Sequence, residues 1–246
     1  MIEDRRPLPE SIGALVQIAS RAYRRRFRLY FGVAVAGLVL EALIAYLRPG
    51  DTGFFYAGWI LVDSSLAALV TIGVVSDLRE GEKLPDRAVL DRGFARWGIV
   101  ALVTTLVDVV IISTSDSVFG PPESTAYGIL IPLVVVLWGS ISFATVIAAI
   151  DENTPALTLV VASVGRSMSL ALARQNFGRL TALAAVAVLP TVIETVLGDQ
   201  LELRKVAGWQ FIANIPIDAL VTGPLQAVFT VFYLDFVRRS TGPRTN

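Results

Sequence analysis

Long apolar stretches alternate with short polar, arginine-bearing segments along almost the whole chain. A membrane-spanning helix needs about 20 mostly apolar residues to cross a hydrocarbon core of about 30 Å. The stretches that approach or meet this length are residues 30–47, 54–75, 97–113, 126–150, 180–197 and 209–237. The pattern predicts an all-α polytopic membrane protein with six transmembrane helices. Residues 1–246 then form a single membrane domain, in which 30–237 hold the spans.

The first 29 residues have the pattern of an amphipathic helix that lies in the membrane interface. Its apolar residues fall on one helical face: Ile12, Leu15, Val16, Ala19 and Tyr23. Its arginines fall largely elsewhere, where they meet anionic headgroups. We therefore expect a headgroup-binding surface formed by Arg21, Arg24, Arg25 and Arg28.

The basic residues predict how the chain is threaded. If the N-terminus is cytoplasmic, only Arg48, Arg204 and Lys205 of the 21 basic residues lie outside. Because cytoplasmic loops carry the excess of lysine and arginine, we expect both termini, the loops 77–96 and 151–179, and the tail 238–246 to be cytoplasmic. This is the topology of a multi-pass protein of the cell membrane.

Aromatic residues near the ends of the stretches fit the same threading. Tryptophan and tyrosine concentrate at the membrane–water interface, and we expect Trp97, like Tyr30, to mark such an end. Trp138 lies deeper in the fourth stretch, which favours a packing role.

A threefold internal pattern runs through the chain. Each unit has a basic stretch, a span outward and a span back, and each entry places a phenylalanine before an arginine: Phe27-Arg28, Phe94-Ala95-Arg96 and Phe177-Gly178-Arg179. One interpretation is a true repeat of helical hairpins, with basic interfacial helices. The other is that membrane proteins commonly re-enter the bilayer through a basic, aromatic segment.

Composition narrows the classes of function. The hydrophobic content is 54%, the mean hydropathy is +0.65 and the formal net charge is zero. Cysteine and histidine are absent, which excludes thiolate metal sites, Cys nucleophiles and the commonest general base. Basic stretches beside spans favour lipid headgroups over nucleic acid. We expect no catalytic residues, no metal site and no cofactor.

Five carboxylates inside the apolar stretches are the strongest candidates for a functional site. Counted from the predicted span ends, Glu41, Asp63, Asp108 and Asp218 share one depth near the midplane, and Glu194 lies nearer the outer surface. An Asp at a span centre costs about 2.5–3.5 kcal/mol on insertion scales. The functional interpretation is an acidic layer that binds a cation, an amine or a proton. The structural alternative is neutral carboxyl groups that hydrogen-bond between helices.

Two short motifs resemble a known family. Gly165-Arg166-Ser167 with the later Asn176-Phe177-Gly178-Arg179-Leu180, and the ending Pro224-Leu225-Gln226-Ala227 with Tyr233-Leu234-Asp235, are similar to bacterial six-span proteins related to the membrane domain of glycerophosphoryl diester phosphodiesterases. The resemblance implies the fold and no chemistry, because the phosphodiesterase activity of fused members belongs to a separate soluble domain. At the ending, Asp235 can pair with Arg238 or Arg239 one helical turn away.

These patterns favour an integral membrane protein that binds or moves a lipid or small amphiphile, or that serves as a scaffold for a membrane-protein partner. The alternative is the permease subunit of a nucleotide-driven exporter, in which the helical loop 84–94 contacts an ATPase. An intramembrane enzyme is a third option, for which no base or metal set is present in the sequence.

Overall fold

The computed structural model describes residues 11–47, 52–78, 84–119, 127–176, 178–185 and 218–241. Every regular element within these ranges is helical, so the prediction of an all-α fold is confirmed for the part of the chain described here. The glutamate at position 194 lies outside these ranges, as does most of the predicted fifth span.

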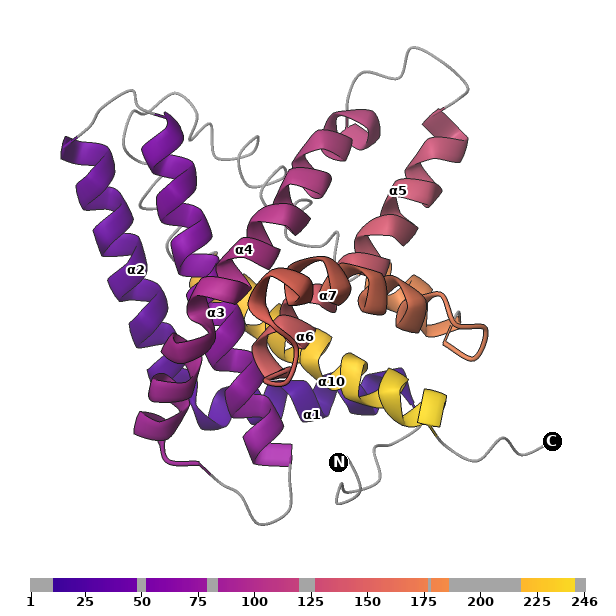
Figure 1. Cartoon of the computed structure of the whole chain (residues 1–246), viewed down its shortest axis with the longest axis horizontal. Helices are drawn as coiled ribbons and strands as arrows, with labels where there is room; N and C mark the ends of the chain where they lie inside the picture. Colours follow the sequence, from indigo (N-terminus) through magenta and orange to yellow (C-terminus); the bar gives the residue numbers. More distant parts are fainter. Residues whose placement is uncertain are drawn as a thin grey trace.

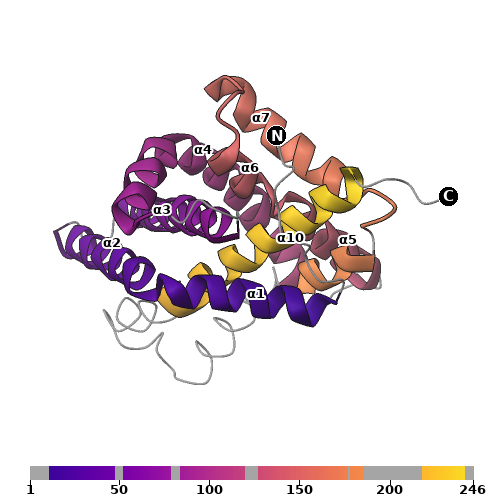
Figure 2. The same ribbon diagram turned by 90° about the horizontal axis from the view of Figure 1, so that it is seen from below.

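Two sets of helices differ in direction (Figures 1 and 2). The upright set alternates up and down along the chain and contains α2 (Phe27–Leu47), α3 (Thr52–Leu78), α4 (Asp86–Phe119) and α5 (Tyr127–Ile141). The second set runs across this direction and contains α1 (Ile12–Arg25), α7 (Ala156–Ala171) and the oblique α10 (Gly223–Thr241). The short helix α6 (Ala144–Ile150) joins the two sets.

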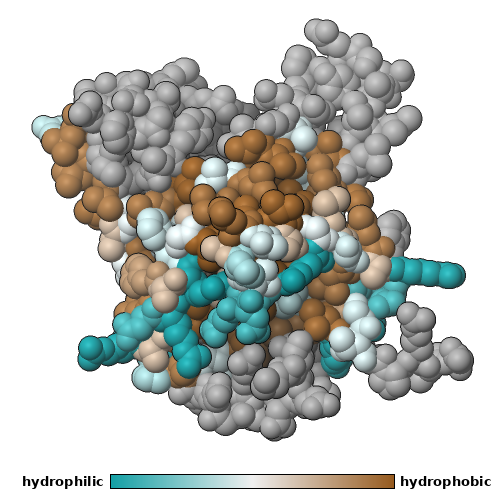
Figure 3. Space-filling model, viewed as in Figure 1, coloured by the Kyte–Doolittle hydropathy of each residue, from teal (hydrophilic) through white to brown (hydrophobic). Residues whose placement is uncertain are grey.

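Three helical stretches among the described residues are long and apolar enough to cross a membrane: Ile60–Leu78, Asp86–Ile111 and Leu220–Thr241. Phe27–Gly37, Val134–Ile150 and Ala156–Ala171 are shorter apolar helices. Figure 3 shows hydrophilic side chains in a band across the lower half of the described surface, and mostly hydrophobic surface above it. These features are consistent with a membrane protein.

Helix α1 forms where the amphipathic pattern places it. The side chain of Ser11 caps its N-terminus by accepting a hydrogen bond from the backbone N–H of Ala14 at 3.3 Å. Arg24 and Arg25 lie in its last turn, where positive charge is favourable near the carbonyl end of the helix. The helix breaks at Arg26, and α2 starts at the next residue. The chain thus turns from the crossing direction into the upright one at Arg26, and α2 starts three residues before the predicted span start at Tyr30.

Helix α4 differs from the prediction, because it is continuous from Asp86 rather than starting near Trp97. Its register with α3 follows from Gly93, which lies directly against Leu69: a Cβ there would be 3.5 Å from the Leu69 Cα. Trp97 then lies beside α3 and donates from Nε1 to the Ser64 hydroxyl at 3.0 Å. Trp97 therefore lies within a continuous helix and its indole is part of the helix pair, while its place at the membrane interface stays a prediction.

The fourth apolar stretch also differs from the prediction, because it is two helices and not one. The break falls at Ser142 and Phe143, between α5 and α6. Ser140 and Ser142 donate their hydroxyls to backbone carbonyls of their own helix, which competes with regular helical geometry. Ser167 of α7 then donates to the Ser140 carbonyl at 2.6 Å and accepts from the Phe143 N–H at 3.1 Å. One buried hydroxyl thus forms hydrogen bonds with backbone groups on both sides of the break.

The interior holds a polar contact among α3, α6 and α10. Gln226 Nε2 donates to Thr71 Oγ1 at 2.9 Å and to Thr145 Oγ1 at 3.5 Å, and the Thr71 and Thr230 hydroxyls are 3.3 Å apart. All four side chains are buried. A π-helical turn, Asp218–Thr222, precedes α10. Pro224 follows this turn, and its missing N–H cannot continue a regular helical ladder. The network and the turn place the last helix obliquely against α3.

Candidate functional site

The four predicted headgroup arginines, three on α1 and one in the first turn of α2, are all exposed. Arg21, Arg24, Arg25 and Arg28 point away from the core, whereas Leu15, Ala19 and Tyr23 are buried. The apolar face does not lie wholly in lipid, however, because α1 packs against α10. Tyr23 lies so close to Gly223 that a Cβ there would be 2.6 Å from its hydroxyl. Of the predicted apolar face, Ile12 and Val16 remain 39% and 38% exposed.

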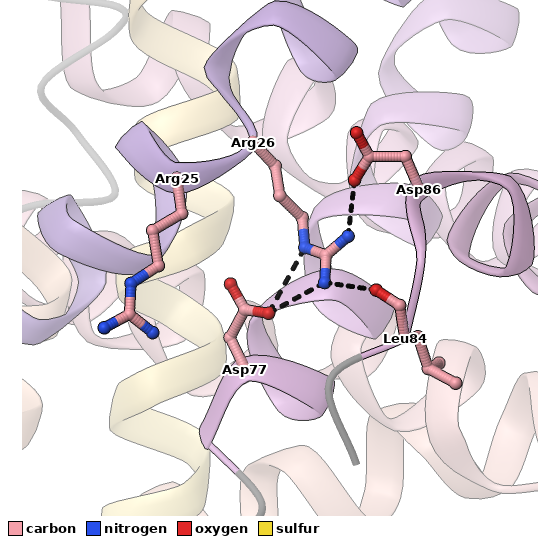
Figure 4. A pocket seen from close by; sticks show the side chains of 5 residues that line it. All are labelled: Arg25, Arg26, Asp77, Leu84 and Asp86. Carbon is pink, nitrogen blue, oxygen red and sulfur yellow. Dashed lines mark hydrogen bonds and ion pairs between the residues drawn. The ribbon is translucent and has the colours of Figure 1, made fainter.

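Arg26 is the one arginine of this segment that turns inward (Figure 4). Its Nη2 donates to Asp77 at 2.8 Å and to the Leu84 carbonyl at 2.7 Å, and its Nη1 donates to Asp86 at 2.6 Å. Burial alone would lower the pKa of Arg26, but the hydrogen bond and charge of Asp77, with the charge of Asp86, raise it. The guanidinium therefore stays charged and ties the junction of α1 and α2 to the ends of α3 and α4.

An open pocket of about 290 Å³ lies beside this cluster, lined by Arg25, Arg26, Asp77, Leu84 and Asp86. In Figure 4 the Arg25 side chain points away from the other four, so its guanidinium is at the pocket's outer side. The lining combines two positive and two negative side chains. Such a lining suits the phosphate and the amine of a zwitterionic headgroup better than an apolar ligand.

A second inward arginine, Arg96, joins α4 to the end of α6. Arg96 of α4 donates from Nη2 to the carbonyls of Ala148 at 2.7 Å and Asp151 at 2.5 Å, at the end of α6. The Asp151 carboxylate accepts from Thr154, Asn153 and Arg166 in the turn that leads to α7. Partial burial would raise the pKa of Asp151, but these hydrogen bonds outweigh it and hold that pKa below its usual value.

A third inward arginine reaches α10. Arg179 donates to Asp235 at 2.6 Å, and the fully buried Asp235 also pairs with Arg238 at 3.1 Å and Arg239 at 3.0 Å. The prediction that Asp235 pairs with Arg238 or Arg239 is confirmed. The partner from the other motif, Arg179, was not predicted. The two motifs that carry the family resemblance thus meet in space.

We refer to the three inward contacts as the hairpin clasps: Arg26 with Asp77, Arg96 with the Asp151 carbonyl, and Arg179 with Asp235. Their partners are 51, 55 and 56 residues apart in the chain. The sequence predicted Arg26 only as cytoplasmic charge, and Arg96 and Arg179 as basic residues at the entries of repeat units, with no partner for any of the three. The signal that it missed is the recurring interval between an arginine near the start of one helix and an aspartate near the end of a later one.

The predicted acidic layer is not assembled at one depth where the structure describes it. Asp63 lies six residues before Leu69 on α3, and Asp108 lies fifteen residues after Gly93 on the antiparallel α4. Since Leu69 and Gly93 are level, the two aspartates are offset by roughly 13 Å along the helices. The equal-depth prediction counted residues from the predicted span ends, whereas the contact of Gly93 with Leu69 gives the register of the two helices directly. Glu41 lies on α2 and Asp218 begins the π-helical turn, but their side chains are outside the described part.

Asp108 and Thr104 each have a buried polar side-chain atom. Its Oδ2 and the Thr104 Oγ1, one turn earlier on α4, are buried atoms without a hydrogen-bond partner among the described residues. No group of three or more acidic side chains in the described ranges is arranged to hold a metal ion.

Comparison with protein-family models, with curated proteins and with solved structures gives no match for this chain.

Proposed function

We propose that the protein is a six-span protein of the cytoplasmic membrane, with both termini cytoplasmic, that binds or moves a lipid or small amphiphile through its headgroup. The observation that carries the proposal is the row of exposed arginines on α1 beside the pocket at Arg25. Because juxtamembrane basic residues attract anionic lipids, these residues form the headgroup surface. Scaffolding of a membrane-protein partner is compatible with the same surface, and no catalytic activity is proposed.

The hairpin clasps support a threefold repeat of helical hairpins. Each clasp joins a helix to the end of a later one at a similar interval, as expected if one hairpin unit was copied. The units differ at their entries: α1 is a separate crossing helix, whereas the second basic stretch is part of α4. The likeness to the phosphodiesterase membrane domains stays a prediction, supported by the contact of its two motifs.

No contact among the described residues specifically favours the exporter alternative. The predicted coupling loop is 84–94, of which residues 86–94 are the first turns of α4. Arg26 and Ser76 both hydrogen-bond to the backbone of Leu84 at its start. Co-purification of an ATPase with the protein would favour this alternative over a lipid-binding role.

The lipid-binding proposal is tested by removing charge from α1 alone. The triple variant Arg21→Gln, Arg24→Gln, Arg25→Gln loses arginines that each contribute about 1 kcal/mol near an anionic surface. We expect its affinity for phosphatidylglycerol to fall on the order of 100-fold, measured by native mass spectrometry of detergent-solubilised protein during lipid titration. The matched control removes three exposed arginines elsewhere: Arg87→Gln, Arg92→Gln and Arg174→Gln. Equal losses in both variants would contradict a site on α1.

A further inference from the structure

Helix α7 has an inverted distribution of side chains. Ser163 and Ser167 are buried against the protein, while Leu157 and Val161 are 85% and 73% exposed. In a water-soluble helix the serines face solvent and the leucine and valine face the core. In a helix that is partly surrounded by lipid, leucine and valine can face outward, because the outward face meets hydrocarbon and not water.

The exposed apolar residues of α7 form one stripe. Leu157, Val161 and Leu172 recur at intervals that place them on the same side of a helix with 3.6 residues per turn. Ser169 and Arg166 are exposed on a different sector. The helix therefore has a protein-facing sector, an outward apolar sector and a polar sector, which is the pattern of a helix that lies in the membrane interface.

The neighbouring helix continues the same apolar surface. Helix α7 packs beside α4, and both lie on the same side of the molecule (Figure 2). On α4, Leu102, Leu106 and Val109 are exposed within a stretch that is apolar and long enough to cross a membrane. The outward side of α7 thus adjoins a surface that hydrocarbon covers if α4 spans the bilayer.

Length excludes a spanning role for α7 itself. Its 16 residues extend for about 24 Å, which is shorter than the hydrocarbon core of about 30 Å. The helix also runs across the upright helices (Figures 1 and 2). Arg166, which is exposed on the polar sector of α7, is placed to meet anionic headgroups.

We propose that α7 is a second interfacial helix, whose stripe of Leu157, Val161 and Leu172 is inserted among the acyl chains of the bilayer. Residues 156–172 then lie in the membrane interface and are not a water-exposed loop. This inference rests on the proposed membrane location, but not on lipid binding by α1.

The test uses the absence of cysteine from the chain. The variants Leu157→Cys and Val161→Cys are labelled with the environment-sensitive fluorophore NBD in the full-length protein and reconstituted into vesicles of phosphatidylcholine and phosphatidylglycerol. Ser169→Cys, on the polar sector of the same helix, and Glu152→Cys, in the preceding turn, are the matched controls. We expect emission shifted to shorter wavelength, and quenching by lipids with a spin label on the acyl chain, at 157 and 161 but not at 152 or 169.

Two results would overturn the inference. Emission at 157 and 161 equal to that at 152 means that water covers the stripe. Shifted emission without quenching by spin-labelled lipid means that protein covers it, either a second copy or another part of the chain. Neither result depends on the α1 arginines, so the two proposals can fail separately.

Discussion

Arg26 carries its charge between two helices whose ends supply Asp77 and Asp86, and only 8% of its side chain is exposed. Buried ion pairs contribute little net stability compared with apolar substitutes, but removal of one partner leaves an uncompensated buried charge. Asp77 is itself 6% exposed, so it cannot recover hydration easily when Arg26 is lost. The stability of the junction between α1 and α2 therefore depends on the pair as a unit.

The variant Arg26→Met should destabilise the protein by about 3 kcal/mol, because Asp77 stays buried without its cation. Thermal unfolding in detergent measures the effect. The double variant Arg26→Met, Asp77→Leu should recover most of the loss, and Arg24→Met, at an exposed position of the same helix, should be nearly silent. A double variant as unstable as the single one would show that the charge pair is not the cause.

At the scale of elements, the break between α5 and α6 depends on a hydroxyl from a third helix. Replacement of Ser167 by alanine leaves the Ser140 carbonyl and the Phe143 N–H buried without this partner, which costs about 1–3 kcal/mol. The control is Ser163→Ala, because Ser163 is equally buried but donates only to Val160 of its own helix. We expect a clear loss of thermal stability in the first variant and a small change in the second. Equal effects would mean that the break is held by packing alone.

The elements also show which structure the sequence could predict. The arginine run and the apolar face predicted an amphipathic helix within the first 29 residues, and α1 forms there, since amphipathic period and charge act within one segment. The start of α4 and the break at Phe143 were not predictable from local hydropathy. The register of α4 against α3 depends on a close contact of Gly93 with Leu69, and the break is held by Ser167 from another helix, so both involve residues far apart in the chain. Asp63 and Asp108 are not level for a related reason, because their depth was counted from helix ends that the sequence did not locate.

At the scale of the whole molecule, charge and hydrophobicity are separated. The described surface has a hydrophilic band in its lower half and is mostly hydrophobic above it (Figure 3), and the arginines of α1 at positions 21, 24 and 25 are exposed. The proposed topology places this band at the cytoplasmic face, which the positive-inside rule favours. The proposals that α1 and α7 contact lipid both fit this orientation.

Cysteine accessibility in intact cells tests the orientation most directly, because the chain has no cysteine of its own. Single cysteines replace Ser117 and Asp199, which the six-span topology places outside, and Glu82 and Thr241, which it places in the cytoplasm. We expect a membrane-impermeant maleimide to label the first two in intact cells, and the last two only after the membrane is permeabilised. Labelling of Glu82→Cys and Thr241→Cys from outside, with protection of Ser117→Cys and Asp199→Cys, would contradict the orientation and the headgroup surface built on it.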